Sequence, residues 1–360
     1  MVYRVVGVMS GSSLDGLDIA FAHLEETGGN WSFEIKAAAC LDYPETLLQS
    51  LQEAVSLPAS DYLLLHSSYG HFIGKAVNEF ITRHGLDHQV QLIASHGHTT
   101  FHLPGKMTAQ LGDGAAIAAE TGINVVSDLR SLDVALGGQG APIVPVGEKL
   151  LWPQVELFLN LGGIANLTFR EHDTFIAFDV CPANRVLNML AAREGKAYDD
   201  GGALSATGTV DADLLSRLDS LAYYQQPAPK SLANEFGSVT VFSLLEKAGL
   251  PTQDALRTYT EHIARQIARA VETQRKSQTE MLVTGGGSFN SFLVDRIRFH
   301  LAASGITLRI PPAEVIQYKE ALVMGLLGIL RWREENTVLH SVTGASRDSI
   351  GGAVWMGQEA

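Results

Sequence analysis

A strand–turn–strand unit occurs twice in this chain, and it constrains the fold more than any other feature. Residues 2–9 and 17–24 predict an antiparallel pair around a turn rich in Gly, Ser and Asp, and residues 33–43 predict a third strand. The stretch VELFLNLGGIANLTF repeats this pattern around a Gly-Gly turn, and TFIAFDV supplies its third strand. The repetition predicts two related domains that face each other across a cleft.

Helix and strand patterns alternate along the rest of the chain. Helical segments are expected at 44–56 and 60–84, and a helix in GDGAAIAAETG ends at Gly122. Short strands are expected in QVQLIASHG and INVVSD, and the second half predicts a helix at 252–275, a strand at 280–287 and a helix in PPAEVIQYKEALVMGLLGILRW. This alternation indicates an α/β fold with a partly parallel sheet.

The length of 360 residues suits two domains. We expect the first at 1–127, with a C-terminal segment of about 340–360 that could return to it, and the second at 128–339. A net charge of -13 argues against nucleic acid or an anionic membrane surface as a partner, because both require clustered Lys and Arg. No stretch is long and apolar enough to span a bilayer, so we expect a cytoplasmic protein, with Cys40 and Cys181 as reduced thiols.

The opening turn, SGSSLDG, offers backbone N–H groups and hydroxyls that could surround an anion. Asp15 and Asp18 would suit a phosphate only if a divalent cation lay between them and the phosphate. A long capped hairpin with Asp at turn positions explains the same residues equally well.

Two further turns follow apolar strands. VTGGGSFN places three glycines between a strand and a helix, where a phosphate chain could approach the backbone, although a tight structural turn has the same composition. It matches neither the dinucleotide fingerprint nor the P-loop. In AFDVCPANRVLNML, Asp179 ends a strand and Pro182 is expected to open the next helix, so Asp179 could be a general base or only a helix-terminal carboxylate.

Other polar residues are ambiguous by themselves. His96, His98 and His102 have the spacing of a metal site, but a polar loop explains them at least as well. Arg130 lies between two aspartates and would ordinarily form a local ion pair, and Glu320 would ordinarily be a solvated helical residue.

Taken together, GVMSGSSLDGLD, ASHGHTT, DLRSLDVALGGQGAPIVP, NLGGIANLT, FDVCPANRVLN and VTGGGSFN, in this order, closely resemble the 1,6-anhydro-N-acetylmuramic acid kinase family. The resemblance runs from residue 7 to about 352. It implies two related ribonuclease H-like domains of the actin and hexokinase type, flanking a nucleotide and substrate cleft. It also implies a kinase that uses ATP and Mg²⁺ to convert 1,6-anhydro-N-acetylmuramic acid and water to N-acetylmuramic acid 6-phosphate in cell-wall recycling.

The resemblance also assigns roles to residues. Asp179 would be the base that activates water for attack on the anomeric carbon, and Asp15 would hold Mg²⁺. The sugar would be bound by Thr99, Arg130 and Glu320. The residues that bind ATP and its phosphates would be Gly11, Ser12, Ser13, Leu14, Asp15, Gly16, Asn166, Gly285, Gly286 and Gly287.

The chain departs from the family pattern in two places. CPAN and Asn188 stand where many members have GPGN and an aspartate, and SHGHT stands where they have SHGQT. Because of these changes, the nucleotide affinity and the metal preference could differ from those of other members. Asp179 itself is retained. The family also implies a homodimer. Three alternatives remain open. Another sugar or acetate-type kinase of the superfamily should lack the stretch LRSLDVALGGQGAP. A non-catalytic ATP-binding regulator would not need Asp179, and a sugar-binding module would not need the three glycines.

Overall fold

The computed structural model describes residues 1–360 except 12–13, 172–173, 229, 234, 275–278 and 358–360. The chain divides into two compact units: the first contains Met1–Pro153 and Tyr318–Ala360, and the second contains Gln154–Gln317. These boundaries differ from the expected ones. Residues 128–153 and 318–339 belong to the first unit, because the helix at Val144–Leu151 packs on the third strand and the helix ending at Trp332 packs on the first.

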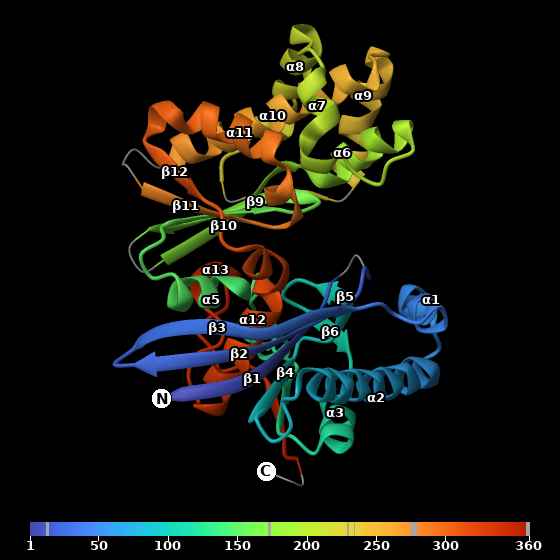
Figure 1. Ribbon diagram of the computed structural model, residues 1–360, viewed down its shortest axis with the longest axis vertical. Helices are drawn as coiled ribbons and strands as arrows, with labels where there is room; N and C mark the ends of the chain where they lie inside the picture. The colour runs from blue at the N-terminus through green and yellow to red at the C-terminus, as the bar shows by residue number, and fades with distance from the viewer. Residues whose placement is uncertain (12–13, 172–173, 229, 234, 275–278, 358–360) are drawn as a thin grey trace. The chain divides into compact units, whose positions relative to one another are not determined.

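The first unit is built on a six-stranded sheet in the order β13-β7-β4-β1-β2-β3, with a separate β5–β6 hairpin (Figure 1). Its strands are β1 (Val2–Ser10), β2 (Leu17–Thr27), β3 (Asn30–Leu41), β4 (Leu92–Ser95), β5 (His98–Leu103), β6 (Met107–Leu111), β7 (Val125–Ser127) and β13 (Ala353–Trp355). Its helices are α1 (Glu45–Glu53), α2 (Ala59–His84), α3 (Gly114–Thr121), α4 (Ser131–Ala135), α5 (Val144–Leu151), α13 (His340–Thr343) and most of α12 (Ala313–Trp332).

The second unit contains a five-stranded sheet in the order β10-β9-β8-β11-β12. Its strands are β8 (Leu157–Leu161), β9 (Ile164–Glu171), β10 (Thr174–Pro182), β11 (Thr279–Thr284) and β12 (Ile306–Arg309). Its helices are α6 (Asn184–Ala191), α7 (Ala203–Thr207), α8 (Ala212–Asp219), α9 (Phe242–Ala248), α10 (Thr252–Gln274) and α11 (Ser291–Leu301).

The two sheets share one topology. In each, three consecutive strands form an antiparallel meander, and the first of them also pairs in parallel with a later strand that has a further parallel neighbour. The meander is β1-β2-β3 in the first unit and β8-β9-β10 in the second. This repeated order confirms the expected fold class of two related ribonuclease H-like domains.

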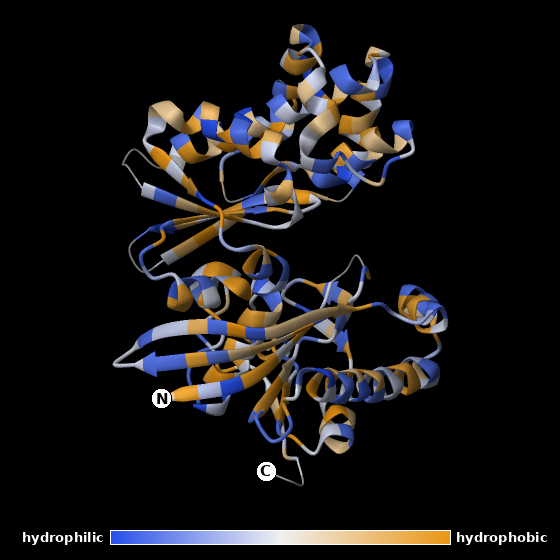
Figure 2. Cartoon of the chain, in the orientation of Figure 1, coloured by the Kyte–Doolittle hydropathy of each residue, from blue (hydrophilic) through white to orange (hydrophobic). Residues whose placement is uncertain are grey.

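The strand and helix patterns of the sequence match buried faces in the structure. In the first unit, Val6 and Val8 of β1 pack with Ile73 and Val77 of α2, and all four side chains are at most 1% exposed. Figure 2 shows the hydrophobic residues along these strands and the mixed composition of α2. On the opposite face, a Cβ at Gly7 would lie 1.8 Å from the carbonyl oxygen of Ala321, so β1 and α12 approach too closely for any other residue.

The core of the second unit is formed by its sheet and the long helix α10, which contributes Tyr259 and Ile263 with no exposed surface. The sequence predicted a helix at the position of α6, but it did not predict α7–α9, which also cover this core, or the β5–β6 hairpin of the first unit. Pro182 does not open a helix: it is the last residue of β10, and α6 begins at Asn184.

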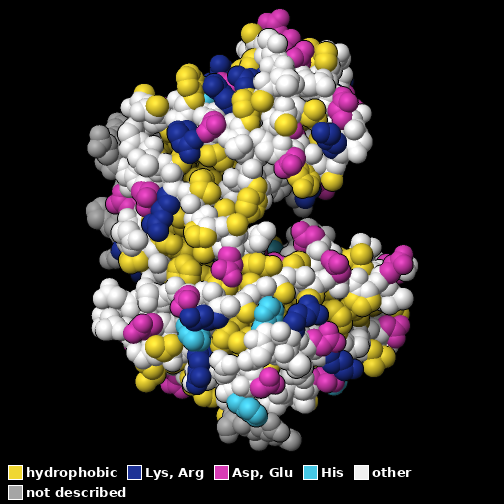
Figure 3. All heavy atoms as spheres, in the orientation of Figure 1, with side chains coloured by type: hydrophobic (Ala, Val, Ile, Leu, Met, Phe, Trp, Pro, Cys, Tyr) yellow, Lys and Arg dark blue, Asp and Glu magenta, His cyan; other side chains and the backbone are white. Residues whose placement is uncertain are grey.

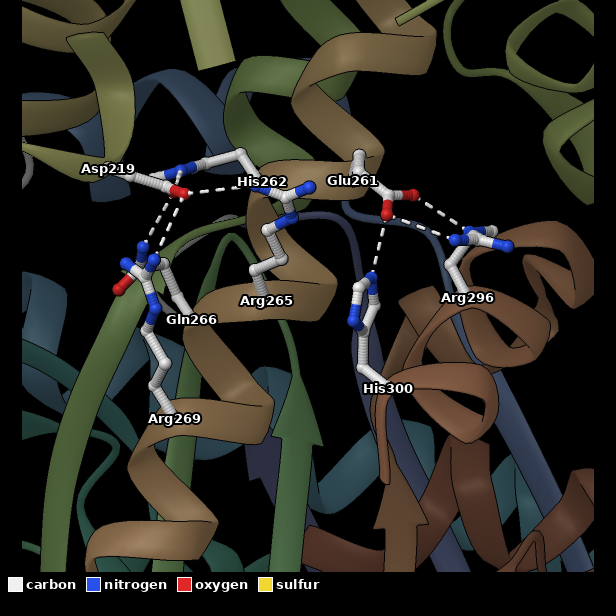
Figure 4. Close-up of polar contacts among 8 residues, drawn as sticks. All are labelled: Asp219, Glu261, His262, Arg265, Gln266, Arg269, Arg296 and His300. Carbon is white, nitrogen blue, oxygen red and sulfur yellow. Dashed lines mark hydrogen bonds and ion pairs between the residues drawn. The ribbon is translucent and has the colours of Figure 1, made fainter. Parts of the chain in front are cut away.

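A polar cluster joins α8 to α10 (Figure 4). Asp219 accepts hydrogen bonds from Nδ1 of His262 at 2.7 Å and from Nε2 of Gln266 at 2.8 Å, and Arg265 and Arg269 lie within ion-pair distance. Burial alone would raise the pKa of Asp219, but these hydrogen bonds and positive charges lower it below its usual value. The cluster therefore fixes the end of α8 on α10.

On the face drawn in Figure 3, acidic and basic side chains are interspersed in both units. Among the described residues, no helix combines the length and apolar composition that crossing a membrane requires.

Candidate active site

In the second unit, Asp179 lies near the end of β10, on the outer edge of the sheet. The register against β9 shifts between Asp179 and Cys181, which is the mark of a β-bulge. Cys181 is fully buried in the hydrophobic core, whereas Asp179 is half-buried. The strand therefore buries one side in the core and presents the carboxylate on the other.

Three hydrogen bonds hold Asp179 in place. Its N–H donates to the carbonyl oxygen of Lys230 at 2.9 Å, its carbonyl oxygen accepts from the hydroxyl of Tyr223 at 2.6 Å, and its Oδ2 accepts from the N–H of Leu232 at 2.8 Å. Burial raises the pKa of Asp179 above its usual value, and the bond from Leu232 opposes this rise. A carboxylate that is oriented through one oxygen and partly desolvated is suited to act as a general base. No local pattern in the sequence pointed to Tyr223 or Leu232.

Two asparagines continue the row of Asp179 across the sheet. Asn166 of β9 pairs with Asp179 of β10 on one side and with Asn160 of β8 on the other. Residues in direct cross-strand register point to the same face of a sheet. The predicted residue Asn166 is therefore next to Asp179, and Asn160, which the sequence did not predict as a site residue, is the next polar residue in the same row.

The three glycines of VTGGGSFN follow β11, as expected. Close packing against neighbouring residues is enough to explain two of them. A Cβ at Gly285 would lie 2.5 Å from Oδ1 of Asn160, and one at Gly287 would lie 2.8 Å from Leu161 and Asn184. Of the three, only Gly286 is exposed, and a Cβ there would make an ordinary contact of 3.9 Å with Nδ2 of Asn184.

The helix expected after these glycines begins later. Gly286–Phe289 form a 3₁₀ turn, and α11 begins only at Ser291. The side chain of Asn290 caps α11, because it accepts a hydrogen bond from the N–H of Leu293 at 2.9 Å. The glycine turn is therefore separated from the N-terminus of α11 by the 3₁₀ turn.

In the first unit, the opening turn joins β1 to β2. Ser12 and Ser13 lie outside the described residues. Leu14 has a positive φ of 57° and donates its N–H to the carbonyl oxygen of Gly11 at 3.2 Å. Gly16 is required by packing, since a Cβ there would lie 2.4 Å from Sγ of Cys40. The residue type at 16 is thus explained without a ligand.

Asp15 and Asp18 form a pair of carboxylates at this turn. Burial raises the pKa of Asp18, and the charge of the exposed Asp15 adds to this rise. A divalent cation would relieve the repulsion between two such carboxylates, and Mg²⁺ takes one or two carboxylates together with phosphate oxygens and water. The residues present therefore fit a Mg²⁺ ion bound with a nucleotide.

The three predicted sugar-binding residues also lie in the first unit. Arg130 precedes α4, and burial lowers its pKa to about 10 while the charges of Glu320 and Asp133 oppose that shift. Glu320 is exposed on α12, and its charge also raises the pKa of Asp18. Thr99 of β5 accepts a hydrogen bond from Nε2 of Gln110 at 3.3 Å. The charge of Glu320 therefore affects the pKa of both Arg130 and Asp18. Thr99 lies on the β5–β6 hairpin.

Arg130 does not form the local ion pair that its neighbours in the sequence suggested. Its Nε donates to Nε2 of His96, and Nη1 donates to the carbonyl oxygen of Gly140. Asp133 instead accepts from the N–H of Gly140 and from the hydroxyl of Thr343, each at 2.7 Å. Arg130 is therefore held by neutral acceptors, which leaves its charge uncompensated by a direct bond to a carboxylate among the described residues.

The predicted site residues thus form two groups. Asp179, Asn166 and the three glycines belong to the second unit, and Gly11, Leu14, Asp15, Gly16, Thr99, Arg130 and Glu320 belong to the first. Of the departures from the family pattern, Asn188 is exposed on α6 and Cys181 is buried. No group of three or more His, Cys, Asp or Glu side chains is placed to hold a metal within the part of the chain that the structure describes.

Comparison with known proteins gives a consistent result. The family model described as anhydro-N-acetylmuramic acid kinase matches residues 3–357. A protein of that name from Shewanella sediminis is 34% identical, with 97% of this chain and 98% of the relative covered, and one from Synechococcus elongatus is 34% identical, with 98% and 99% covered. A relative from Bacillus cereus, also of that name, is 31% identical over 97% of this chain and 98% of its own length.

Solved structures are more distant. The activator of the 2-hydroxyisocaproyl-CoA dehydratase from Clostridium difficile, with bound ADPNP, has a TM-score of 0.49 at 13% identity and covers 92% of this chain and 96% of its own. A putative sugar kinase from Cytophaga hutchinsonii has a TM-score of 0.37 at 10% identity and covers 89% and 99%. Neither TM-score is high enough to support an inference about this chain.

Proposed function

Because the chain belongs to the anhydro-N-acetylmuramic acid kinase family, we propose that Asp179 is the catalytic base of a reaction that opens the anhydro bridge of 1,6-anhydro-N-acetylmuramic acid and phosphorylates it. Family membership makes the chain a phosphotransferase with ATP as the phosphate donor and a role in cell-wall recycling. The roles of individual residues are what we propose. They are supported above all by the carboxylate of Asp179, which is half-buried and held in place by a hydrogen bond from Leu232.

The chemistry begins at this carboxylate. With Oδ2 engaged by Leu232, Oδ1 is the oxygen left to accept a proton from water as the water attacks the anomeric carbon. The bond from that carbon to the bridging 6-oxygen breaks, and the 6-oxygen forms a new bond to the γ-phosphorus of ATP while the bond to ADP breaks. The products are N-acetylmuramic acid 6-phosphate, ADP and one proton. The raised pKa of Asp179 makes its carboxylate a stronger base than an exposed aspartate.

Residues of the first unit would bind the ligands. Arg130 and Glu320 offer a fixed donor and an acceptor for polar groups of the sugar, and Thr99 offers a hydroxyl. Asp15, with the backbone of the opening turn, would hold Mg²⁺ and the phosphates. When bound, Mg²⁺ neutralises the phosphate charge that develops during transfer.

In the second unit, Gly286 is the exposed residue of the three-glycine turn, so the nucleotide would approach the backbone there. Asn166 lies beside Asp179 and would contribute an amide to the same face. Gly285 and Gly287 would take part through their backbone, since their side-chain positions are occupied by neighbouring atoms.

A product-mass experiment tests the reaction. The protein is incubated with Mg·ATP and 1,6-anhydro-N-acetylmuramic acid in ordinary water and in heavy-oxygen water. We expect a product heavier than the sugar by phosphate plus water, with the heavy oxygen at the anomeric carbon. Phosphate without water would indicate an ordinary sugar kinase, and ATP binding without any product would indicate a regulator. Either outcome contradicts the proposal.

Two further properties are proposed from the family alone. ATP is held inside the cell, which argues for a cytoplasmic enzyme, and the family resemblance argues for a homodimer. Light scattering coupled to size-exclusion chromatography tests the second: a mass of one chain at micromolar concentration would contradict it.

A further inference from the structure

The histidines of the ASHGHTT motif have no role in the reaction as proposed above. His96 lies between the end of β4 and the start of β5 and is only 3% exposed. The connection requires a glycine, because Gly97 has a φ of 71° and a Cβ there would lie 2.3 Å from the carbonyl oxygen of Leu111. The backbone around His96 is therefore tightly constrained, and its ring has a defined position.

Both ring nitrogens of His96 are engaged. Nδ1 lies 2.8 Å from the carbonyl oxygen of Gly97, and Nε2 lies 2.8 Å from Nε of Arg130. A carbonyl oxygen can only accept and an arginine Nε can only donate. Nδ1 must therefore carry the proton and Nε2 must carry the lone pair, which defines a single neutral tautomer. Burial, with the charge of Arg130, lowers the pKa of His96 to about 3, so this tautomer persists at neutral pH.

The guanidinium of Arg130 is consequently fixed from one side. Nε is held by His96, and Nη1 is held by the carbonyl oxygen of Gly140. Gly140 is anchored in turn, since its N–H donates to Oδ2 of the buried Asp133 at 2.7 Å. No bond among the described residues engages Nη2, so the donors of this end are available to a ligand.

We propose that His96 is a positioning residue for the sugar: by accepting the Nε hydrogen of Arg130, it aims the outer edge of the guanidinium at the substrate. This rests on the proposed function, in which Arg130 binds the sugar. The role requires an acceptor at the position of Nε2 and does not require a titrating imidazole. It also excludes His96 as a metal ligand in this state, because its one lone pair is used by Arg130.

A pair of substitutions separates this role from a merely structural one. In His96→Asn, the amide can replace Nδ1 and still donate to the carbonyl oxygen of Gly97, but nothing reaches Arg130. In His96→Gln, the longer amide can place an oxygen near the position of Nε2. Since a hydrogen bond to a charged group contributes about 1.5–3 kcal/mol, we expect His96→Asn to raise the KM for the sugar about 10–100-fold, with the KM for ATP unchanged. His96→Gln should recover most of that loss.

The matched control is His88→Asn. His88 is exposed and precedes β4, at the end of that strand opposite to His96, and its positive φ of 58° is one that asparagine tolerates. Its substitution should leave both KM values unchanged. If His96→Asn and His96→Gln are folded and equally impaired, or both unimpaired, the proposal is overturned.

A double-mutant cycle distinguishes failure of this inference from failure of the proposed function. Arg130→Ala is measured alone and with His96→Asn. If Arg130→Ala leaves the KM for the sugar unchanged, the assignment of Arg130 is wrong. If Arg130→Ala raises it and His96→Asn adds its full effect in that background, Arg130 binds the sugar but His96 does not act through it. The expected result is that His96→Asn has no further effect once Arg130 is absent.

A spectroscopic measurement on the unsubstituted protein keeps the test independent of folding and activity. Nitrogen NMR of labelled histidine should show His96 with a protonated Nδ1 and a bare Nε2 from about pH 5 to pH 8, the range in which an unperturbed histidine titrates. An imidazole at this position that titrates, or that carries its proton on Nε2, would refute the proposed hydrogen bond to Arg130.

Discussion

The backbone N–H of Leu232 donates a hydrogen bond of 2.8 Å to Oδ2 of Asp179, across 53 positions of sequence. The segment that carries Leu232 also supplies the carbonyl oxygen of Lys230 to the N–H of Asp179, so it contacts the edge strand β10 through both the backbone and the carboxylate. One carboxylate oxygen is thereby used for orientation and the other is left for chemistry. This arrangement determines both the catalytic role and the pH behaviour that we expect of Asp179.

Asp179→Asn should lower kcat about 10²–10⁴-fold, the usual contribution of a general base, and leave the KM values for sugar and ATP within a few-fold. The amide oxygen can still accept the bond from Leu232, while the amide nitrogen has no basicity. Steady-state kinetics on the anhydro sugar provide the measurement. Asp213→Asn, an exposed acid on α8, is the matched control and should be unaffected. A folded Asp179→Asn protein that turns over at the wild-type rate would require a different base.

The raised pKa of Asp179 predicts a pH dependence of the rate and of stability. The base acts only when ionised, so kcat/KM should fall as the pH drops through a value above about 3.9, the usual pKa of an exposed aspartate. The folded state holds this proton more tightly than the unfolded state, so the carboxyl contributes stability at low pH that is lost as the pH rises through the folded-state pKa. Asp179→Asn should therefore not lower Tm at neutral pH. A substantially lower Tm would show that the ionised carboxylate stabilises the fold.

Asp15→Ala should weaken the use of Mg·ATP without disturbing the fold. Asp15 is exposed at the opening turn, and the loss of one carboxylate from a site with one or two carboxylate ligands should raise the Mg²⁺ concentration needed for half-maximal rate about tenfold or more. The measurement is the initial rate against total Mg²⁺ at saturating sugar. Asp42→Ala tests for a general effect of lost negative charge. Wild-type kinetics of Asp15→Ala at limiting Mg²⁺ would remove Asp15 from the metal site.

Asp219→Ala should destabilise the protein by about 3 kcal/mol, because it leaves the buried His262 and Gln266 without their acceptor. Urea unfolding gives this value. Asp295→Ala removes an exposed ion pair with Arg298 and should cost about 0–1 kcal/mol. Equal losses from the two substitutions would show that the cluster on α10 adds nothing beyond surface charge.

The same cluster predicts a loss of stability in acid. The pKa of Asp219 is lowered in the folded protein, so its stabilising contribution is present above the unfolded-state pKa and disappears as the pH falls through the folded-state pKa. The difference in unfolding free energy between wild type and Asp219→Ala should therefore shrink on acidification below about pH 4. A difference that stays constant would mean that the ionised form of Asp219 is not what the cluster stabilises.

Much of the fold could be predicted from the sequence because its signals are local. The antiparallel strands at 2–9 and 17–24, the helix ending at Gly122 and the long helix of 252–275 all correspond to elements within a few residues of the expected bounds. Apolar periodicity reports which side of an element is buried, and a glycine that follows a helix reports where it stops. The repeated strand–turn–strand unit likewise predicted the shared topology of the two sheets.

The domain boundaries, in contrast, could not be predicted from local sequence patterns. The sequence placed 128–153 and 318–339 in the second domain, but the structure places them in the first, where Gly7 admits α12 against β1 and α5 packs on β3. A segment's membership in a core is decided by which distant surface it covers. Composition and periodicity show that α12 is apolar but do not show where it packs.

For the candidate site, too, the local features could be predicted from the sequence and the long-range contacts could not. Runs of consecutive residues were enough to place Asp179 near the end of a strand, although β10 continues to Pro182, and to show that the family motifs occur in order. The orientation of Asp179 by Leu232, and the hold of His96 on Arg130 through a lone pair across 34 positions, arise only in the folded chain. Hydrogen bonds between residues far apart depend on the path of the loops that join them, and loop paths follow from packing of the whole unit and not from any local pattern.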